Sequence, residues 1–304
     1  MFRLLNSLCK VHSPSGEEVY MKQFILSYVQ ANAKYWRSQP QIFHGDLFQD
    51  CVVLVFGTPR TAAFAHMDTT GFTVRYQNQL IPIGSPEVQG GEQLTGRDEL
   101  GEIACGLELH DDGHCYHRFG RAISPGTSLA FKNSFVENDT FIISPYLDNR
   151  VGMFNLLKVA ETIAHGALVF SCWEEHGGGS VPYLVKFLYE NFGISKMLIS
   201  DITWISDGID FDEGVVISNR DRNIPRRSFV QHITRVAMQH GIRFQQEVEA
   251  HGSSDGREIQ ISPYPIDWCF VGPPIADAHS DHESVAKKDI HSTIELYKVL
   301  MAQL

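Results

Sequence analysis

The segment from Ala167 to Gly179 constrains the fold of this chain more than any other stretch. It reads ALVFSCWEEHGGG, an apolar run followed by two glutamates, a histidine and three glycines. A short run rich in β-forming residues predicts a buried strand, and the glycines predict a sharp turn after it. Adjacent residues at a strand end point to opposite faces. Glu174 and Glu175 can therefore serve different purposes, such as binding a metal ion and transferring a proton, whereas an isolated pair of this kind more often faces solvent.

Strand and helix patterns alternate around this segment. Strands are predicted over 196–201, 214–218, 243–249 and 267–271, and helices over 181–192, 226–241, 255–260 and 289–304, with another helix ending near His165. Such alternation indicates an α/β fold with a mixed, mostly parallel sheet and helices on both faces. Functional sites in such sheets lie beyond the carboxyl ends of the strands, which is where Glu174, Glu175 and Asp201 stand.

The first 70 residues predict two helices followed by strands. A short helix over 1–12 precedes Ser15, which has Glu18 three residues later in the pattern of a capping box. The second helix extends to about Ala33. Strands are then predicted over 35–38, 42–47 and 50–56, and a central strand begins at residue 61. His66 and Asp68 lie two positions apart near its end, so they face the same way if that segment is extended.

Residues 71–140 differ from the rest because helical periodicity disappears. Short alternating runs are separated by Gly, Pro, Asp and Asn, which predicts a small all-β unit of barrel or sandwich type. The sequence therefore predicts a discontinuous catalytic domain, 1–70 and 141–304, with an inserted barrel-like domain at 71–140. We expect this domain to serve in oligomerisation or in gating the access of substrate. The segment 110–117 is rich in His and Asp, but its Asp-Asp-Gly sequence favours a hairpin turn over a metal site.

Composition excludes several classes of partner. The chain has 25 basic and 36 acidic residues, a net charge of −11, which argues against nucleic acid or an anionic membrane surface as its main partner. No apolar run approaches membrane-spanning length, and the first residues do not form a signal peptide. Six scattered cysteines without a Cys-x-x-Cys pair are typical of free buried thiols. These features predict a cytoplasmic protein.

Histidines and carboxylates at several predicted strand ends or turns form a candidate metal site. Imidazole and carboxylate together suit a divalent cation such as zinc, with cobalt or manganese as alternatives. The set exceeds what one tetrahedral zinc ion needs, and it is sufficient for two ions that share a bridging carboxylate. The candidates are His66, Asp68, Asp148, Glu174, Glu175, Asp201 and His279.

These residues carry a resemblance to a known family. In order along the chain, HMDTTGF at 66–72, LDNRVG at 147–152, the double glutamate at 174–175, Asp201 after Ser200, and His279 before Ser280 resemble the motifs of the M42 glutamyl-type metallo-aminopeptidases. The M18, M20 and M28 families belong to the same superfamily. The 80 positions between Asp68 and Asp148 hold the all-β unit, and an insertion at this point is similar to M42 rather than to relatives that insert a domain after the glutamates.

The resemblance implies a role for each candidate. His66, Asp148 and Asp201 would hold one metal ion, and Asp148, Glu175 and His279 the other, with Asp148 as the bridge. Asp68 would orient His66. Glu174 would be the general base that takes a proton from the metal-bound water and passes it to the leaving amine. Thr69 departs from the family, which usually has a second carboxylate there.

The predicted function is therefore metal-dependent aminopeptidase activity on short peptides, with two divalent ions per chain and a homo-oligomeric assembly. A metal-dependent deacylase or amidohydrolase of N-acyl amino acids is the alternative enzyme that uses the same ligands. A metal-stabilised binding or assembly protein without turnover is the non-enzymatic alternative, and the presence of Glu174 and both histidines argues against it.

Overall fold

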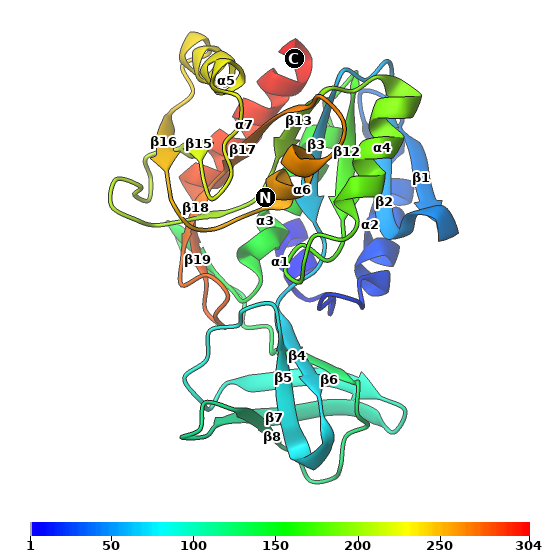
Figure 1. Cartoon of the computed structure of the whole chain (residues 1–304), viewed down its shortest axis with the longest axis vertical. Coiled ribbons are helices and arrows are strands. Elements are labelled where there is room, and N and C mark those ends of the chain that lie inside the picture. Colours follow the sequence, from blue (N-terminus) through cyan, green and yellow to red (C-terminus); the bar gives the residue numbers. More distant parts are fainter. Residues whose placement is uncertain (1) are drawn as a thin grey trace.

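The computed structural model describes residues 2–304, and its body is built on an eight-stranded sheet in the order β1-β2-β12-β3-β13-β17-β15-β16 (Figure 1). The strands of this sheet are β1 (Gln41–Gly45), β2 (Gln49–Phe56), β3 (Thr61–His66), β12 (Gly166–Ser171), β13 (Lys196–Ile199), β15 (Val215–Arg220), β16 (Phe244–Val248) and β17 (Asp267–Gly272).

The centre of the sheet is parallel. Strand β3 pairs in parallel with β12, where Ser171 lies opposite His66, and with β13, where Ile199 lies opposite Phe64. All residues of β3 and β12 are buried, as expected for parallel strands covered on both faces. Strands β2 and β15 run antiparallel to their inner neighbours, so the sheet is mixed. The carboxyl ends of β3, β12 and β13 meet at one edge of the sheet.

Helices cover both faces, which confirms the α/β prediction. The path from β3 through α3 to β12 and the path from β12 through α4 to β13 run in opposite directions across the sheet. Right-handed crossovers of opposite direction lie on opposite faces. Helix α3 packs against α1 and α7, whereas α4 packs against α6. The helices are α1 (Arg3–Cys9), α2 (Val19–Asn32), α3 (Leu147–Ala160), α4 (Val181–Phe192), α5 (Arg227–Gln239), α6 (Asp255–Ile261) and α7 (Lys287–Gln303), with 3₁₀ turns η1 (Ala33–Tyr35), η2 (Asp46–Phe48) and η3 (Tyr76–Asn78).

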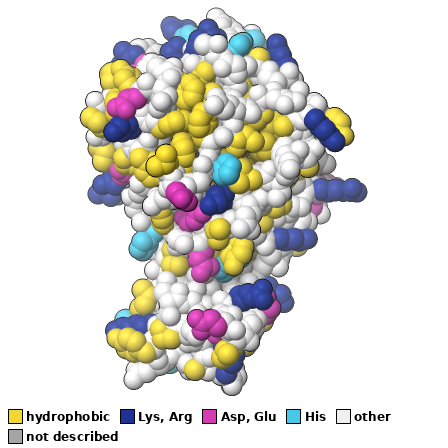
Figure 2. Space-filling model, turned by 90° about the vertical axis from the view of Figure 1, so that its right-hand side faces the viewer, with side chains coloured by type: hydrophobic (Ala, Val, Ile, Leu, Met, Phe, Trp, Pro, Cys, Tyr) yellow, Lys and Arg dark blue, Asp and Glu magenta, His cyan; other side chains and the backbone are white. Residues whose placement is uncertain are grey.

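A closed antiparallel barrel in the order β4-β5-β8-β7-β6-β9 forms a separate, narrower lobe (Figures 1 and 2). The barrel has its own apolar core, which includes Phe72, Leu94, Leu107 and Phe131. A turn in which His110 and His114 are hydrogen-bonded joins β7 to β8, as the Asp-Asp-Gly sequence predicts. The strands are β4 (Gly71–Val74), β5 (Gln79–Ile83), β6 (Gln93–Asp98), β7 (Gly101–Leu109), β8 (Cys115–Arg118) and β9 (Ser128–Phe131).

A second sheet of five short strands was not expected from the sequence. Its order is β10-β11-β19-β18-β14. Strand β10 lies before residue 140 in the chain, yet it pairs with β11 of this sheet and not with a barrel strand. The predicted limit of the inserted domain at residue 140 stays a prediction. The strands are β10 (Val136–Glu137), β11 (Phe141–Ile143), β14 (Thr203–Trp204), β18 (Pro274–Ala276) and β19 (Ser284–Ala286).

Two local predictions near the N-terminus are wrong. Residues 35–38 form no strand, because the 3₁₀ turn η1 ends helix α2 there. Ser15 does not cap α2, since its hydroxyl donates to Asp68 Oδ2 at 2.6 Å, and the N-cap position belongs to Glu18. The predicted helix over 1–12 is the shorter α1, and Met1 lies outside the described residues. Between residues 2 and 304, no helix has both the length and the apolar character that crossing a membrane requires.

Candidate metal centre and active site

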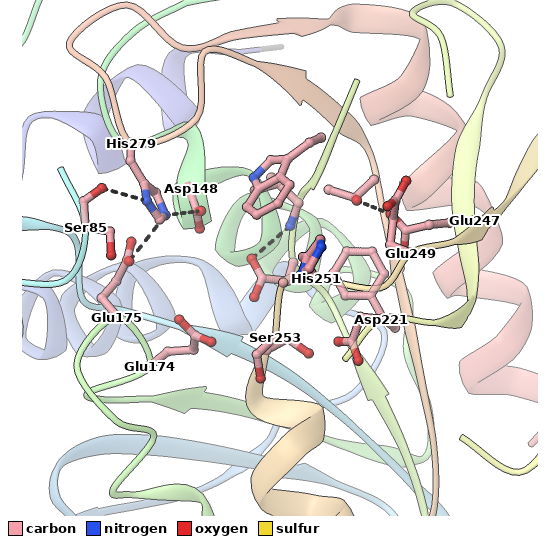
Figure 3. Close-up of a pocket in the computed structure, with 17 residues that line it drawn as sticks. Ser85, Asp148, Glu174, Glu175, Asp221, Glu247, Glu249, His251, Ser253 and His279 are labelled. Carbon is pink, nitrogen blue, oxygen red and sulfur yellow. Dashed lines mark hydrogen bonds and ion pairs between the residues drawn. The ribbon is translucent and has the colours of Figure 1, made fainter. Parts of the chain in front are cut away.

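The predicted site residues converge at the carboxyl edge of the central sheet. Figure 3 shows four of them, Asp148, Glu174, Glu175 and His279, around one cavity. His66 is the last residue of β3, the glutamates 174 and 175 follow β12, and Asp201 follows β13. Asp148 stands in the first turn of α3, and His279 lies in the loop between β18 and β19. Because β12, β3 and β13 are adjacent and parallel, their ends bring together residues that are more than 100 positions apart.

Asp148 joins two groups of possible metal ligands. Its Oδ1 lies 3.1 Å from Nε2 of His66, and its Oδ2 lies 3.3 Å from Nε2 of His279. Asp201 approaches His66 Nε2 at 3.6 Å, and Glu175 approaches His279 Nε2 at 3.4 Å. In each group of three, one nitrogen or oxygen atom per residue lies within 4.8 Å of the other two. The two carboxylate oxygens of Asp148 therefore face different groups.

The charges in this cluster favour cations. Asp148 and Asp201 are buried and Glu174 is half-buried. No described Lys or Arg forms an ion pair with these three side chains or with Glu175. Burial, followed by the charge of Asp148, raises the pKa of Glu175 to about 8. Burial opposes protonation of His66, yet its pKa is raised because Asp201 and the other carboxylates outweigh that effect. Imidazole nitrogens and carboxylate oxygens gathered around two positions fit divalent metal ions.

Glu174 belongs to neither group but lines the same cavity as Asp148, Glu175, Asp201 and His279 (Figure 3). Burial is the largest cause that raises the pKa of Glu174 well above its usual range, and nearby carboxylates add to it. A carboxyl group with a raised pKa can accept a proton and give it back near neutral pH. The position of Glu174 therefore suits proton transfer beside the candidate metal ligands.

Asp68 contacts both His66 and the glutamate segment. Its carboxylate Oδ1 lies 3.5 Å from Nδ1 of His66, and its backbone carbonyl oxygen lies 3.1 Å from the same nitrogen. The backbone N–H groups of Glu174 and Glu175 donate to its two carboxylate oxygens at 3.0 and 3.1 Å. The resemblance implied the first contact, and the second was not expected. Asp68 thus fixes one histidine and the backbone of both glutamates.

Sequence reasoning missed the position of Glu283. Its carboxylate is buried and accepts the backbone N–H of Asp148 at 2.9 Å and that of His279 at 2.8 Å. One side chain therefore holds the backbone of Asp148, which the two candidate groups share, and of His279, which belongs to the second group. Proximity to His279 in the sequence was the only available signal, because Asp148 lies 135 positions away.

The segment after β5 reaches from the barrel lobe to the site. The carbonyl oxygen of Ser85 lies 3.1 Å from Nδ1 of His279, and the backbone N–H of Glu87 donates to the carbonyl oxygen of His279 at 3.0 Å. The N–H of Gly84 donates to Nδ1 of His176 at 3.1 Å, so this segment also contacts the turn after the glutamates. The position of His279 therefore depends on both lobes.

A mixed α/β sheet with imidazole and carboxylate groups clustered at its strand ends is typical of metal-dependent hydrolases. The family model described as M42 glutamyl aminopeptidase matches residues 117–296, more than half of the chain. The chain belongs to this family, and it is a metal-dependent aminopeptidase. A metallopeptidase family implies divalent metal ions. A search of curated proteins finds no match.

Solved structures share the whole fold. The TET aminopeptidase from the marine sediment archaeon Thaumarchaeota archaeon SCGC AB-539-E09 has a TM-score of 0.87 at 17% identity, over 100% of this chain and 97% of that chain. Aminopeptidase APDkam598 from Desulfurococcus kamchatkensis has a TM-score of 0.87 at 19% identity, over 100% and 94%. The TET1 peptidase of Pyrococcus horikoshii, which can assemble into a tetrahedron or a large octahedral shell, has a TM-score of 0.84 at 18% identity, over 100% and 99%.

Proposed function

We propose that this chain is a dinuclear aminopeptidase that removes N-terminal residues from short peptides. The observation that supports it is the shared position of Asp148 between two groups of three possible ligands, with Glu174 on the wall of the same cavity. His66, Asp148 and Asp201 would hold one ion, and Asp148, Glu175 and His279 the other. Zinc suits this donor set, with cobalt and manganese as alternatives.

The bound ions would act as Lewis acids that lower the pKa of water and polarise the scissile carbonyl. Side chains of the protein transfer the proton and hold the candidate ligands in position. Glu174 takes a proton from the attacking water at its carboxylate and delivers it to the leaving amine nitrogen. Asp68 holds the backbone of Glu174 in place and fixes the ring of His66. Glu283 holds the backbone of Asp148 and His279.

The first test combines metal analysis with kinetics. Mass spectrometry of the purified protein should find two divalent ions per chain, and hydrolysis of aminoacyl chromogenic substrates should stop on chelation and return with zinc or cobalt. Glu174→Gln should keep both ions and lose at least about 100-fold in kcat. Wild-type rates in a metal-loaded Glu174→Gln protein would contradict the assigned mechanism. Faster cleavage of N-acylated than of free-amine substrates would favour the deacylase alternative.

We also propose that the chain forms a homo-oligomer and that the barrel lobe takes part in assembly or in substrate gating. The assemblies of the Pyrococcus horikoshii peptidase support assembly, and the contacts of Ser85 and Glu87 with His279 support gating. Deletion of residues 73–139 should produce a smaller particle in light scattering, with circular dichroism as the control for folding. An unchanged particle size would reject the assembly role of the barrel.

A further inference from the structure

A cavity of about 260 Å³ extends from the metal-ligand cluster to a second, separate set of acidic side chains (Figure 3). Asp148 and Glu174 line one end. At the other end lie Glu247 on β16, Glu249 immediately after it, and Asp221 immediately after β15. A substrate whose scissile bond lies at the candidate metal ligands can therefore place one of the side chains that flank this bond beside these three carboxylates.

The distal carboxylates have few partners inside the protein. Glu247 is 4% exposed. Thr203 donates to its Oε1, and the nearby side chain of Ser218 also favours the ionised form of Glu247 by lowering its pKa. Ser206 donates to Glu249 Oε1 at 2.9 Å. None of the three forms an ion pair with a Lys or Arg between residues 2 and 304. The Asp221 carboxylate accepts the backbone N–H of Asn223. The guanidinium of Arg220 donates to the backbone carbonyl of Asp221, and its charge lowers the pKa of the Asp221 carboxyl without an ion pair.

This arrangement suits an elongated cation better than a metal ion. The residue groups close enough to share a metal do not include Asp221, Glu247 or Glu249, so the three carboxylates do not bring one oxygen atom each within 4.8 Å of the other two. Trp204 and Phe270 supply apolar surface beside them, which is what the methylene stem of Lys or Arg packs against. Burial raises the pKa of both Glu247 and Asp221, so an incoming positive charge would favour their ionised forms.

We propose that this acidic pocket selects peptides whose N-terminal residue is lysine or arginine. The inference rests on the proposed aminopeptidase function and adds its substrate class. It departs from the description of the family as glutamyl aminopeptidases, because a glutamate side chain would meet three like charges in the pocket. Among the residues that line this end of the cavity, His251 is the one basic side chain, and it stands against the three carboxylates of Asp221, Glu247 and Glu249.

Matched substrates test the charge directly. Lysyl and norleucyl chromogenic amides have the same chain and differ in the terminal ammonium group. A charge-assisted hydrogen bond contributes about 1.5–3 kcal/mol, so kcat/KM for lysyl should exceed that for norleucyl by about 10- to 100-fold, with glutamyl the poorest. Faster cleavage of norleucyl, leucyl or glutamyl substrates than of lysyl and arginyl substrates would overturn the inference.

Variants assign the selectivity to the pocket. Glu247→Gln and Glu249→Gln should each lower the lysyl-to-norleucyl ratio of kcat/KM by about 10-fold, mainly through KM. Glu213→Gln is the control, because Glu213 pairs with Arg243 on the surface of the same region and should leave the ratio unchanged. Calorimetry of lysyl-alanine and norleucyl-alanine binding to the Glu174→Gln protein gives a readout without turnover. A ratio that stays constant in both pocket variants would overturn the inference.

Failure of the two proposals can be told apart. Metal-dependent hydrolysis with no preference for lysyl or arginyl substrates rejects the pocket inference and leaves the aminopeptidase proposal intact. No hydrolysis of any aminoacyl substrate by protein with two bound metal ions rejects the proposed function, and the pocket inference with it. Circular dichroism of each variant excludes misfolding as the cause of a lost preference. If either Glu247→Gln or Glu249→Gln does not fold, the other variant still tests the pocket.

Discussion

Glu283 is not a candidate ligand, yet its side chain holds the backbone of two candidate ligands in place. Its two carboxylate oxygens accept backbone N–H groups of Asp148 and His279, so removing them leaves two donors without partners next to the site. Partners of this kind typically change metal affinity or activity by 10- to 100-fold. The sequence did not suggest this role, because the contact with Asp148 arises only from the folded chain.

Glu283→Ala should therefore weaken metal binding and lower kcat/KM by at least about 10-fold. Glu283→Gln keeps one acceptor oxygen and should lose less. Metal affinity can be measured by competition with a chromogenic chelator, with Glu295→Gln as the control, because Glu295 forms only an exposed pair with Lys298. Equal metal affinity in wild type and Glu283→Ala would rule out the positioning role.

Arg150 is a buried charge that holds the N-terminal segment against β3. It is fully buried and donates to the carbonyl oxygen of Met67 at 2.6 Å and to Ser13 Oγ at 2.7 Å. Burial lowers its pKa to about 10, so it stays protonated at neutral pH. The residue lies on α3, two positions after Asp148, and its bonds tie that turn of the helix to the strand end that carries His66.

Arg150→Ala should lower the free energy of unfolding by about 3 kcal/mol or more, because it creates a cavity and leaves buried acceptors unpaired. Arg150→Met fills more of the space and should lose less. Urea denaturation measures both, with exposed Arg235→Ala as the control. A loss of less than about 1 kcal/mol in Arg150→Ala would contradict this account.

The ends of β13 and β17 approach each other so closely that position 272 on β17 has no room for a side chain. A Cβ atom added to Gly272 on β17 would lie 1.5 Å from the carbonyl oxygen of Asp201. Because both atoms belong to backbones, no rotamer change relieves the overlap. Gly272 therefore permits the approach that places Asp201 beside His66.

Gly272→Ala should move the end of β13, cost about 3 kcal/mol or more of stability, and reduce the metal content of the purified protein. Thermal denaturation and metal analysis by mass spectrometry measure the two effects. Gly120→Ala is the control, because an added Cβ there meets nothing within 4 Å. Full metal content and an unchanged melting temperature in Gly272→Ala would contradict the claim that the close approach of β13 and β17 is needed to position Asp201.

The ion pair between Asp98 at the end of β6 and Arg121 joins two parts of the barrel. Arg121 donates to both carboxylate oxygens of Asp98, at 2.6 and 2.7 Å. This hydrogen bonding is the main reason that the pKa of Asp98 falls to about 2. A lowered carboxyl pKa contributes stability that is present above the unfolded value near 3.9 and is lost as the pH falls toward 2.

Asp98→Asn should therefore lower the melting temperature at pH 5 to 7, and the difference from wild type should shrink as the pH falls from about 4 toward 2. Calorimetry across this pH range measures it. Glu102→Gln, in a widely exposed pair with Arg97, should show little change at any pH. A difference that stays constant down to the lowest pH would exclude the ion pair as its source.

The elements that the sequence predicted well are those with long, regular patterns. The apolar runs of β2, β3 and β12 and the helical periodicity of α4 and α7 identify those elements without tertiary information. The strands of the second sheet have only two or three residues each, which is too short for any periodicity. Ser15 looked like a helix cap because a local rule applies to it, but its hydroxyl bonds to Asp68, 53 positions away.

The candidate site was predictable for a similar reason. The end of each central strand carries a residue able to bind metal, and parallel strands place those ends together. What the sequence did not indicate is the support around them, which comes from Glu283, the backbone contacts of Asp68 and the carbonyl of Ser85. These contacts depend on how loops and lobes pack, and no repeating pattern encodes them.

Considered as a whole, the molecule gathers carboxylates that have no Lys or Arg partner among residues 2–304 at the carboxyl edge of the central sheet, next to the barrel lobe. Removal of divalent ions should therefore lower the melting temperature, because the buried carboxylates then repel one another, and each bound ion at 100 times its Kd adds about 2.7 kcal/mol to the folded state. Differential scanning calorimetry with and without a chelator measures this shift, and zinc or cobalt should reverse it. Identical melting curves would argue against metal ions at these carboxylates.

The ring of His279 is held by the carbonyl of Ser85 on one side and by two carboxylates on the other. The candidate ligand groups thus extend from residue 66 to residue 279 of the chain. During synthesis on the ribosome, His279 is the last of these groups to emerge, after the whole barrel segment. A chain that stops before residue 279 consequently lacks one of these groups, and it should have no peptidase activity.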